Sequence, residues 1–252
     1  MSFAVAADAY DRFMGRFSVP LATVFADFAG VAPGQRALDV GCGTGAMTAE
    51  LIGRVGLDGV AAVEPSATFF ASMRERFPEV DVRQAPAERI PFGDGEFDIA
   101  VAELVVHFMA DPVAGLREMA RVTRDSGVIA ACVWDHEGGT GPLATFWAAV
   151  HDLDPDATDE ADLAGAHEGH LGELMREAGL VDVTDGSIEV RVELPTFEAW
   201  WDPFTLGVGP AGAYVAGLDD EHRDRLRDRC HAGFPDVPFA VSARAWAARG
   251  IA

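Results

Sequence analysis

The stretch Ala37-Leu-Asp-Val-Gly41-Cys-Gly43-Thr-Gly45-Ala46 decides how this chain is interpreted. An apolar strand pattern runs into three glycines at alternate positions, and a helical pattern begins at Thr44. A glycine loop that ends a strand and opens a helix is a candidate ligand-binding loop, because small residues let a ligand approach the backbone closely. The sequence therefore places one candidate site at the end of its first predicted strand.

Working outward from this loop, the apolar periodicity alternates between strand and helix. We expect strands at 37–40, 60–63, 80–82, 98–102, 127–133, 181–194 and 239–247, and helices at 44–51, 112–122, 143–150, 170–178 and 219–230. A further helix is expected after Ser66, with Phe70, Met73 and Phe77 on one face. Alternating β-α-β units form a parallel sheet with helices on both faces, so we predict an α/β fold.

The loop alone does not identify its ligand, because Gly41, Gly43 and Ala46 also satisfy a dinucleotide-binding fingerprint. Asp39 lies directly before the loop, where a carboxylate repels a pyrophosphate and attracts a cationic or zwitterionic ligand. A short-chain nicotinamide enzyme would need a catalytic lysine, and the chain has none. Glu64 ends the next predicted strand, where an acidic side chain can bind both ribose hydroxyls.

Further motifs follow in order along the chain. They are Asp39-Val-Gly-Cys-Gly-Thr-Gly45, Val63-Glu-Pro65, Ala87-Glu-Arg-Ile-Pro-Phe92 and Phe97-Asp-Ile-Ala100, preceded by Tyr10-Asp-Arg-Phe-Met-Gly-Arg16. With these motifs, residues 8–134 resemble class I S-adenosylmethionine-dependent methyltransferases, most closely the small-molecule type 11 group, which includes quinone-biosynthesis enzymes. The resemblance implies a Rossmann-like sheet of seven strands, mostly parallel, with an antiparallel last strand.

The resemblance also implies S-adenosylmethionine as cofactor and a set of residues that bind it. Asp39 reaches the ammonium group, the glycines pass under the methionyl part, and Glu64 holds the ribose. The full implied set is Asp39, Gly41, Cys42, Gly43, Gly45, Glu64, Pro65 and Ala87 with Glu88 at the adenine, and Glu103 near the methionine moiety. The chain departs from the family at Pro86, where members often have an Asp for the adenine amine, because proline offers neither a side-chain acceptor nor an N–H donor.

Methyl transfer from a sulfonium is an in-line displacement in which the protein mainly supplies orientation, so the sequence need not carry a fixed catalytic set. His107, just after the fourth strand, is the best candidate for a base, and a packed histidine is the alternative. Tyr10 lies in the lead-in, which covers the cofactor in this family. Candidate acceptor-pocket residues are Arg16, Trp134, Phe146, Trp147, Trp200, Trp201 and Phe204, although aromatic side chains also build cores.

Composition excludes other functions. The 19 basic residues are all arginines and face 41 acidic ones, for a formal charge of −22, which disfavours a nucleic-acid partner. The three cysteines are scattered, and two of the seven histidines, His167 and His170, flank a glycine, so we expect neither disulfides nor a metal site. The sequence has no signal-peptide pattern and no long apolar run, so we expect a cytoplasmic protein away from membranes.

We therefore predict a single domain over 1–252. It has a helical lead-in at 1–35 that begins its main helix at Ser18 and ends at Gly30, a cofactor-binding core at 36–134, and an acceptor cap with the final strands at 135–252. The acidic stretch 152–162 is expected to be solvated. We expect methyl transfer to a small, partly apolar acceptor. The alternatives are a non-catalytic protein that binds the same cofactor and, on the loop pattern, a dinucleotide-dependent oxidoreductase.

Overall fold

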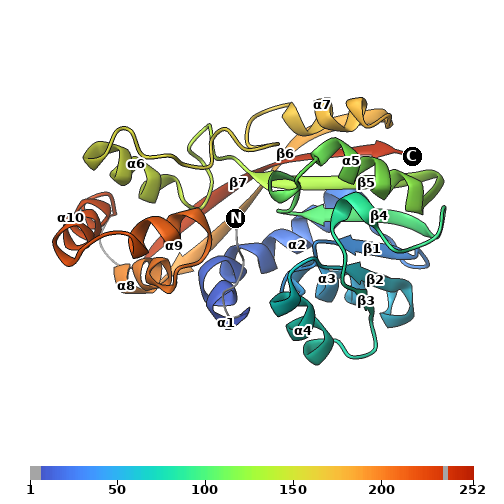
Figure 1. The fold of residues 1–252 in the computed structure, drawn as a ribbon, viewed down its shortest axis with the longest axis horizontal. Coiled ribbons are helices and arrows are strands. Elements are labelled where there is room, and N and C mark those ends of the chain that lie inside the picture. Colours follow the sequence, from blue (N-terminus) through green and yellow to red (C-terminus); the bar gives the residue numbers. More distant parts are fainter. Residues whose placement is uncertain (1–6, 235–237) are drawn as a thin grey trace.

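The computed structural model describes residues 7–234 and 238–252. At its centre is one sheet with the strand order β3-β2-β1-β4-β5-β7-β6 (Figure 1). The strands are β1 (Ala37–Val40), β2 (Val60–Val63), β3 (Asp81–Arg83), β4 (Phe97–Glu103), β5 (Thr123–Trp134), β6 (Val181–Leu194) and β7 (Phe239–Ile251). The first five pair in parallel, and β7 is antiparallel to both β5 and β6. The predicted fold is confirmed, with β5 and β7 longer than expected.

Helices cover both faces of the sheet (Figure 1). On one face lie α2 (Arg16–Ala29), α3 (Ala46–Val55) and α4 (Ala67–Arg76), and on the other lie α5 (Pro112–Val122) and α7 (His170–Glu177). Successive residues of a strand point to opposite faces, so Ala37 packs with the first group while Leu38 and Val40 pack with the second. Each large apolar side chain buried this way contributes about 1.5–3 kcal/mol, which fixes the positions of the strand ends.

A group of helices that we call the cap gathers beyond one end of the sheet, at the left of Figure 1. It consists of α6 (Ala144–Leu153), α8 (Phe197–Trp201), the turn η5 (Asp202–Leu206), α9 (Gly209–Ala216) and α10 (Asp220–His231). An aromatic core holds it together: the Phe204 ring lies 4.6 Å from Phe146 and 4.7 Å from Trp200, centroid to centroid. The predicted helical insertion is thus present, and its core is continuous with the core between the lead-in and the sheet.

The lead-in differs from the prediction. The helix α1 (Ala7–Tyr10), a π-helical turn η1 (Asp11–Gly15) and α2 follow one another without a break, because the intervening residues keep helical backbone angles. Ser18 is therefore buried inside α2, and its predicted role as the helix cap was wrong. Gly30 does end α2, with a φ of 79°.

The predicted apolar face of α4 was also partly wrong. Phe69 and Met73 are the buried residues of this helix, while Phe70 is half-buried and lies beside Arg74. Residues four apart share a helical face, so Phe69 and Met73 are the pair that meets the core. Within the described residues, no helix is both long enough and apolar enough to span a membrane.

Candidate active site

The glycine loop between β1 and α3 is tied to the end of β2 by its backbone. The N–H groups of Gly41 and Cys42 both donate to the carbonyl oxygen of Val63, at 2.8 and 3.1 Å. Gly41, Gly43 and Gly45 have φ values of 72°, 55° and 95°, which L side chains adopt only with strain. The alternate glycines seen in the sequence are thus required by the path of the loop.

The three glycines face different surroundings. A Cβ atom at Gly41 would lie 2.5 Å from Val105, and one at Gly45 would lie 2.5 Å from Phe77, so protein side chains already fill both places. A Cβ atom at Gly43 would meet no atom nearer than 3.9 Å. Gly43 therefore leaves its face of the loop open to a ligand.

Glu64, at the end of β2, is buried beside the loop. Its Oε2 accepts a hydrogen bond from the N–H of Gly43 at 2.9 Å, and its Oε1 accepts one from the N–H of Ser66 at 2.8 Å. Burial raises the pKa of Glu64, and the two N–H donors act in the opposite direction. The carboxylate is thereby fixed between the loop and the start of α4, at the place predicted for a ribose.

Asp39 and Cys42 flank the loop as buried side chains. Asp39 accepts a hydrogen bond from the Thr48 hydroxyl at 2.5 Å, and burial raises its pKa to about 7. Burial also raises the pKa of the Cys42 thiol well above its ordinary value, so this thiol is neutral at physiological pH. Asp39 is thus the group of the two that can change charge when a cationic ligand arrives.

The lead-in is fastened to the loop by Asp11. Its carboxylate accepts a hydrogen bond from the Thr44 hydroxyl at 2.5 Å and one from Arg76 at 2.7 Å, and Arg76 also donates to the carbonyl oxygen of Thr44 at 2.7 Å. We call Asp11, Thr44 and Arg76 the latch. It joins η1, the loop and the end of α4, which brings the neighbouring Tyr10 over the site.

Tyr10 and the end of β4 complete the walls. Two cavities of about 330 and 530 Å³ share Tyr10, Gly41, Gly43, Glu103 and Leu104 as lining residues, and together we call them the glycine-loop cleft. Asp39 and Cys42 line the first cavity, and Glu64 and Pro65 the second. The predicted cofactor residues of β1, β2 and β4 therefore come together around one cleft.

Glu103 and Leu104 carry signs of a functional position. Oε1 of Glu103 is buried and has no hydrogen-bond partner among the described residues, and burial raises the pKa of this carboxyl well above its usual range. Leu104 has a φ of 60°, a left-handed conformation that is strained for a leucine. Such strain concentrates at binding sites, where the surrounding fold holds it.

On the predicted adenine side, the structure places the residues without showing a ligand contact. Ala87 is buried in the core, Pro86 is exposed, and Oε1 of Glu88 accepts from the N–H groups of Ala110 and Asp111 at 2.7 and 3.1 Å. The adenine roles of Ala87 and Glu88 stay predictions. Because Glu88 already accepts two hydrogen bonds, an adenine amine must share this carboxylate with the 110–111 backbone.

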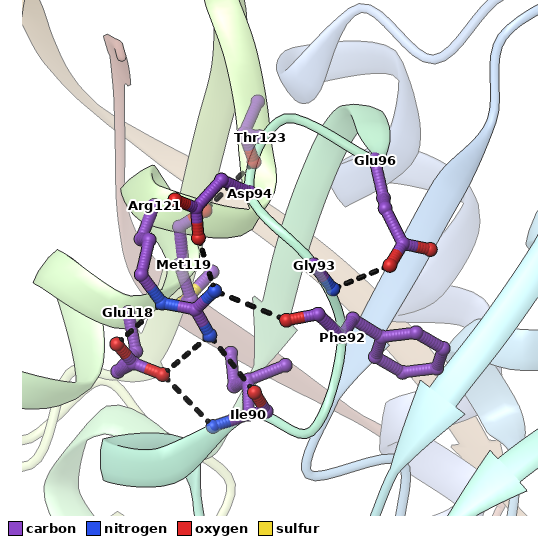
Figure 2. A network of polar contacts seen from close by, with 9 residues as sticks. All are labelled: Ile90, Phe92, Gly93, Asp94, Glu96, Glu118, Met119, Arg121 and Thr123. Atoms are coloured by element: carbon purple, nitrogen blue, oxygen red, sulfur yellow. Dashed lines mark hydrogen bonds and ion pairs between the residues drawn. The ribbon is translucent and has the colours of Figure 1, made fainter.

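The segment after these residues is pinned by Arg121 at the end of α5 (Figure 2). The guanidinium donates to the carbonyl oxygens of Ile90 and Phe92 at 2.9 and 3.0 Å, and it pairs with Glu118 and Asp94 at 2.8 and 2.7 Å. Glu118 also accepts from the N–H of Ile90 at 3.1 Å. The 90–94 segment is therefore held by side chains rather than by a strand.

A separate cavity of about 450 Å³, which we call the histidine chamber, adjoins the cleft and shares Tyr10, Leu104 and Phe108 with it. Its apolar walls include Phe13, Met14, Phe108, Leu143, Val208 and Ala211, and its polar residues are His107, Trp134, His136 and Glu160. The lead-in, the end of β4 and the cap all contribute to it. The chamber is therefore built from three separate parts of the chain and opens beside the cleft.

The polar residues of the chamber are buried and uncharged or weakly acidic. Burial lowers the pKa of His107 well below its ordinary value and that of His136 to about 4. Glu160 accepts a hydrogen bond from the indole N–H of Trp147 at 3.1 Å, and burial raises its pKa to about 7. The predicted solvation of the 152–162 stretch was thus wrong at Glu160, because Trp147 draws this carboxyl inside.

The predicted acceptor residues divide into two groups. Trp134 lines the histidine chamber, as do the catalytic candidates Tyr10 and His107. Trp147 and Trp200 are buried in the cap, and the Arg16 guanidinium donates to the carbonyl oxygens of Ala199 and Trp200 at 2.6 and 3.3 Å. Arg16 therefore joins the lead-in to the cap. Trp147 and Trp200 lie in the packed interior of the cap rather than in the chamber lining.

The cleft lies where the sheet of an α/β fold offers a ligand-binding site. The strand order reverses between β1 and β4, and ligands of open α/β sheets bind at the carboxyl ends of strands at such a point. The glycine loop, Asp39, Glu64 and Glu103 all lie there. The family model for a methyltransferase domain of type 11 matches residues 38–131.

Comparison with known proteins identifies the class. The chain is 36% identical over 122 residues to a demethylmenaquinone methyltransferase of Beutenbergia cavernae, covering 48% of each protein, and 34% identical over 177 residues to an O-methyltransferase of Penicillium expansum, covering 66% of this chain and 60% of that one. The chain thus spans about half the length of the first relative. The match of residues 38–131 and these partial sequence similarities support a class I S-adenosylmethionine-dependent methyltransferase of the type 11 group.

The fold agrees with this assignment. A phosphoethanolamine N-methyltransferase of Haemonchus contortus, solved with S-adenosylhomocysteine, superposes with a TM-score of 0.60 at 16% identity, over 97% of this chain and 56% of the other. At this level of identity the likeness concerns the fold alone. What the chain methylates has to be argued from its own residues.

Proposed function

We propose that this protein transfers the methyl group of S-adenosylmethionine to a small, partly apolar acceptor. The observation that carries the proposal is that the glycine-loop cleft and the histidine chamber share Tyr10, Leu104 and Phe108 as walls. A cofactor in the cleft and an acceptor in the chamber would therefore meet at these three residues. Family membership supports the cofactor, and the mostly apolar chamber supports a partly apolar acceptor.

The residues of the cleft suit the parts of this cofactor. Glu64 would hold the ribose hydroxyls, because a carboxylate accepts two hydrogen bonds from a diol. Asp39 would attract the ammonium group through the cleft, and Gly43 would let the methionyl part lie against the loop. When bound, S-adenosylmethionine supplies an activated methyl on a sulfonium. Glu103 gives the cleft a further carboxyl, whose Oε1, unpaired among the described residues, can accept a hydrogen bond from the cofactor.

The protein's own contribution is orientation. The latch and Arg16 fix the lead-in to the loop and to the cap, so Tyr10 is held between cofactor and acceptor. Such positioning can account for roughly 7–11 kcal/mol of a barrier. His107, buried in the chamber with a lowered pKa, would be unprotonated near neutral pH and free to accept a proton.

The experiment that tests the proposal is turnover with isotope-labelled methyl. The protein is incubated with S-adenosylmethionine labelled in its methyl group and with a library of small apolar acceptors, and mass spectrometry follows labelled products and S-adenosylhomocysteine. We expect acceptor-dependent formation of both. Binding of S-adenosylhomocysteine with no turnover on any acceptor would instead support a non-catalytic cofactor-binding protein.

A further inference from the structure

The polar end of the histidine chamber has three nitrogen atoms without partners. Nδ1 of His107, Nε1 of Trp134 and Nε2 of His136 are buried and make no hydrogen bond within the described part of the chain. Trp134 and His107 are 2% and 7% exposed, so bulk water does not satisfy them. A buried polar atom left unpaired costs about 1–3 kcal/mol, so these three point to a polar ligand atom that enters the chamber.

The charges around the chamber limit what that ligand can be. Its described lining contains no arginine, the chain has no lysine, and both histidines have pKa values lowered by burial. Glu160 carries the one carboxyl group of the described lining, and the Tyr10 hydroxyl is uncharged near neutral pH because burial raises its pKa. A carboxylate or phosphate would be buried here without a cation, which is costly.

We infer that the acceptor is an uncharged, largely apolar compound whose methylated atom is a hydroxyl oxygen, held by Trp134 and deprotonated by His107. This inference rests on the proposed function and specifies its substrate class. The apolar walls would take the body of the compound, and its hydroxyl would meet the unpaired nitrogens.

A hydroxyl fits the donors of the chamber better than an amine does. The indole N–H of Trp134 can only donate, so its partner must offer a lone pair. A neutral amine has one lone pair, and that pair must attack the methyl group. A hydroxyl oxygen has two, so one can accept from Trp134 while the other attacks, and its proton can be donated to the unpaired Nδ1 of His107. An ammonium ion has no lone pair to accept a hydrogen bond from the indole N–H of Trp134.

The proposed step balances within this set of groups. The acceptor oxygen forms a bond to the methyl carbon while the carbon–sulfur bond breaks and its electron pair stays on sulfur. The O–H electron pair stays on the acceptor oxygen, and the proton moves to Nδ1 of His107. The positive charge of the sulfonium thus ends on an imidazolium, and the product is a methyl ether. His136, beside His107 at 6.0 Å between ring centroids, is the next basic group in the chamber.

The test compares functional groups on shared scaffolds. The protein is saturated with S-adenosylhomocysteine and titrated calorimetrically with the hydroxyl, amino and carboxyl derivatives of benzene, naphthalene and cyclohexane. We expect the hydroxyl member to bind best on any scaffold that binds. With S-adenosylmethionine in place of the product, mass spectrometry should find the methyl ether of that member.

Two variants separate recognition from proton transfer. Trp134→Phe keeps an aromatic ring without the N–H, and we expect it to weaken hydroxyl binding about 3–10-fold. His107→Gln keeps a polar side chain without basicity, and we expect hydroxyl affinity within about threefold of the parent but turnover lower by about 10²–10⁴-fold. Trp246→Phe, the same substitution on β7 outside the chamber lining, is the control that should change neither the hydroxyl affinity nor the turnover.

The outcomes are distinguishable. If S-adenosylhomocysteine itself does not bind, the proposed function fails. If it binds but an amino or carboxyl member is preferred, or no hydroxyl member binds, only the substrate class is overturned. If thermal melting shows that Trp134→Phe and the parent are both folded, equal hydroxyl affinity of the two proteins would also contradict the inferred substrate class.

Discussion

The carboxylate of Glu64 and the backbone N–H of Gly43 are hydrogen-bonded at 2.9 Å. This bond joins the end of β2 to Gly43, the loop glycine whose Cβ position is open. The acid predicted to hold the ribose and the glycine predicted to pass under the methionyl part are thus in direct contact before any ligand is present. A substitution at either residue should therefore affect both the conformation of the loop and the binding of a ligand.

The loop glycines predict two different defects. Gly45→Ala places a Cβ atom 2.5 Å from Phe77 at a φ of 95°, so we expect it to lower the free energy of unfolding by at least about 2 kcal/mol. Gly43→Ala has open space, so we expect about 1 kcal/mol from backbone strain but at least about tenfold weaker binding of S-adenosylhomocysteine. Urea denaturation and calorimetry measure the two effects. Similar stability losses in both variants would contradict this distinction.

Asp39 predicts how cofactor binding depends on pH. Its pKa of about 7 in the free protein means that it is largely protonated below pH 7, whereas an ammonium group in the cleft favours the carboxylate. Binding must then release a proton, so affinity for S-adenosylhomocysteine should fall as pH falls, by about tenfold per pH unit at the limit. Calorimetry over about three pH units, from about pH 5.5 to about pH 8.5, measures the affinity. Repeating it in buffers that differ in ionisation enthalpy gives the number of protons released.

A matched variant separates Asp39 from its neighbour. The pKa of Glu64 is also raised, so Glu64 can add to the same pH dependence. Asp39→Asn cannot ionise and keeps an oxygen for the Thr48 hydroxyl. We expect the Asp39→Asn variant to bind S-adenosylhomocysteine more weakly above about pH 7 and to release far fewer protons on binding. An unchanged proton release in Asp39→Asn would show that Asp39 is not the titrating group.

We expect the latch to slow the dissociation of the cofactor from the cleft. Asp11→Ala removes the contacts to Thr44 and Arg76, so the lead-in should open more often and S-adenosylhomocysteine should dissociate about 5–30-fold faster. Stopped-flow displacement measures this rate. Asp8→Ala, at an exposed acid on α1, is the control. Equal dissociation rates for the two variants would mean that the latch does not control access.

Arg121 predicts a contribution to stability away from the cleft. Arg121→Met loses the hydrogen bonds to the Ile90 and Phe92 carbonyls and the pairs with Glu118 and Asp94 shown in Figure 2, so we expect unfolding to become easier by about 1–3 kcal/mol. Urea denaturation checks this, with Arg89→Met at an exposed position of the same segment as the control. A loss no larger than the control's would refute the prediction.

The parts of the fold that depend on local pattern could be predicted from the sequence. The loop after β1 was recognised because positive φ values demand glycine at 41, 43 and 45, and Glu64 was recognised because an acid at the end of β2 has a fixed relation to that loop. The strand count and the antiparallel last strand followed from the resemblance. These features are carried by residues that are near one another in sequence or belong to an ordered motif.

The parts that depend on long-range contact could not be predicted. Glu160 lies in an acidic stretch that favours solvation, and only the Trp147 indole across the fold brings it inside. Asp11 meets Thr44 and Arg76 through contacts between three separate elements. Arg16 looked like a substrate residue by motif, yet its partners are carbonyls of the cap. No local periodicity records any of these pairings.

The account's central claim is that the cleft around Glu64 and Gly43 binds S-adenosylmethionine. Calorimetric titration with S-adenosylhomocysteine, repeated on Glu64→Ala and with NAD as a control ligand, tests it most directly. We predict binding by the parent in the micromolar range, a loss of at least about tenfold in the variant, and no binding of NAD. Failure of the parent to bind S-adenosylhomocysteine, or a preference for NAD, would contradict the claim.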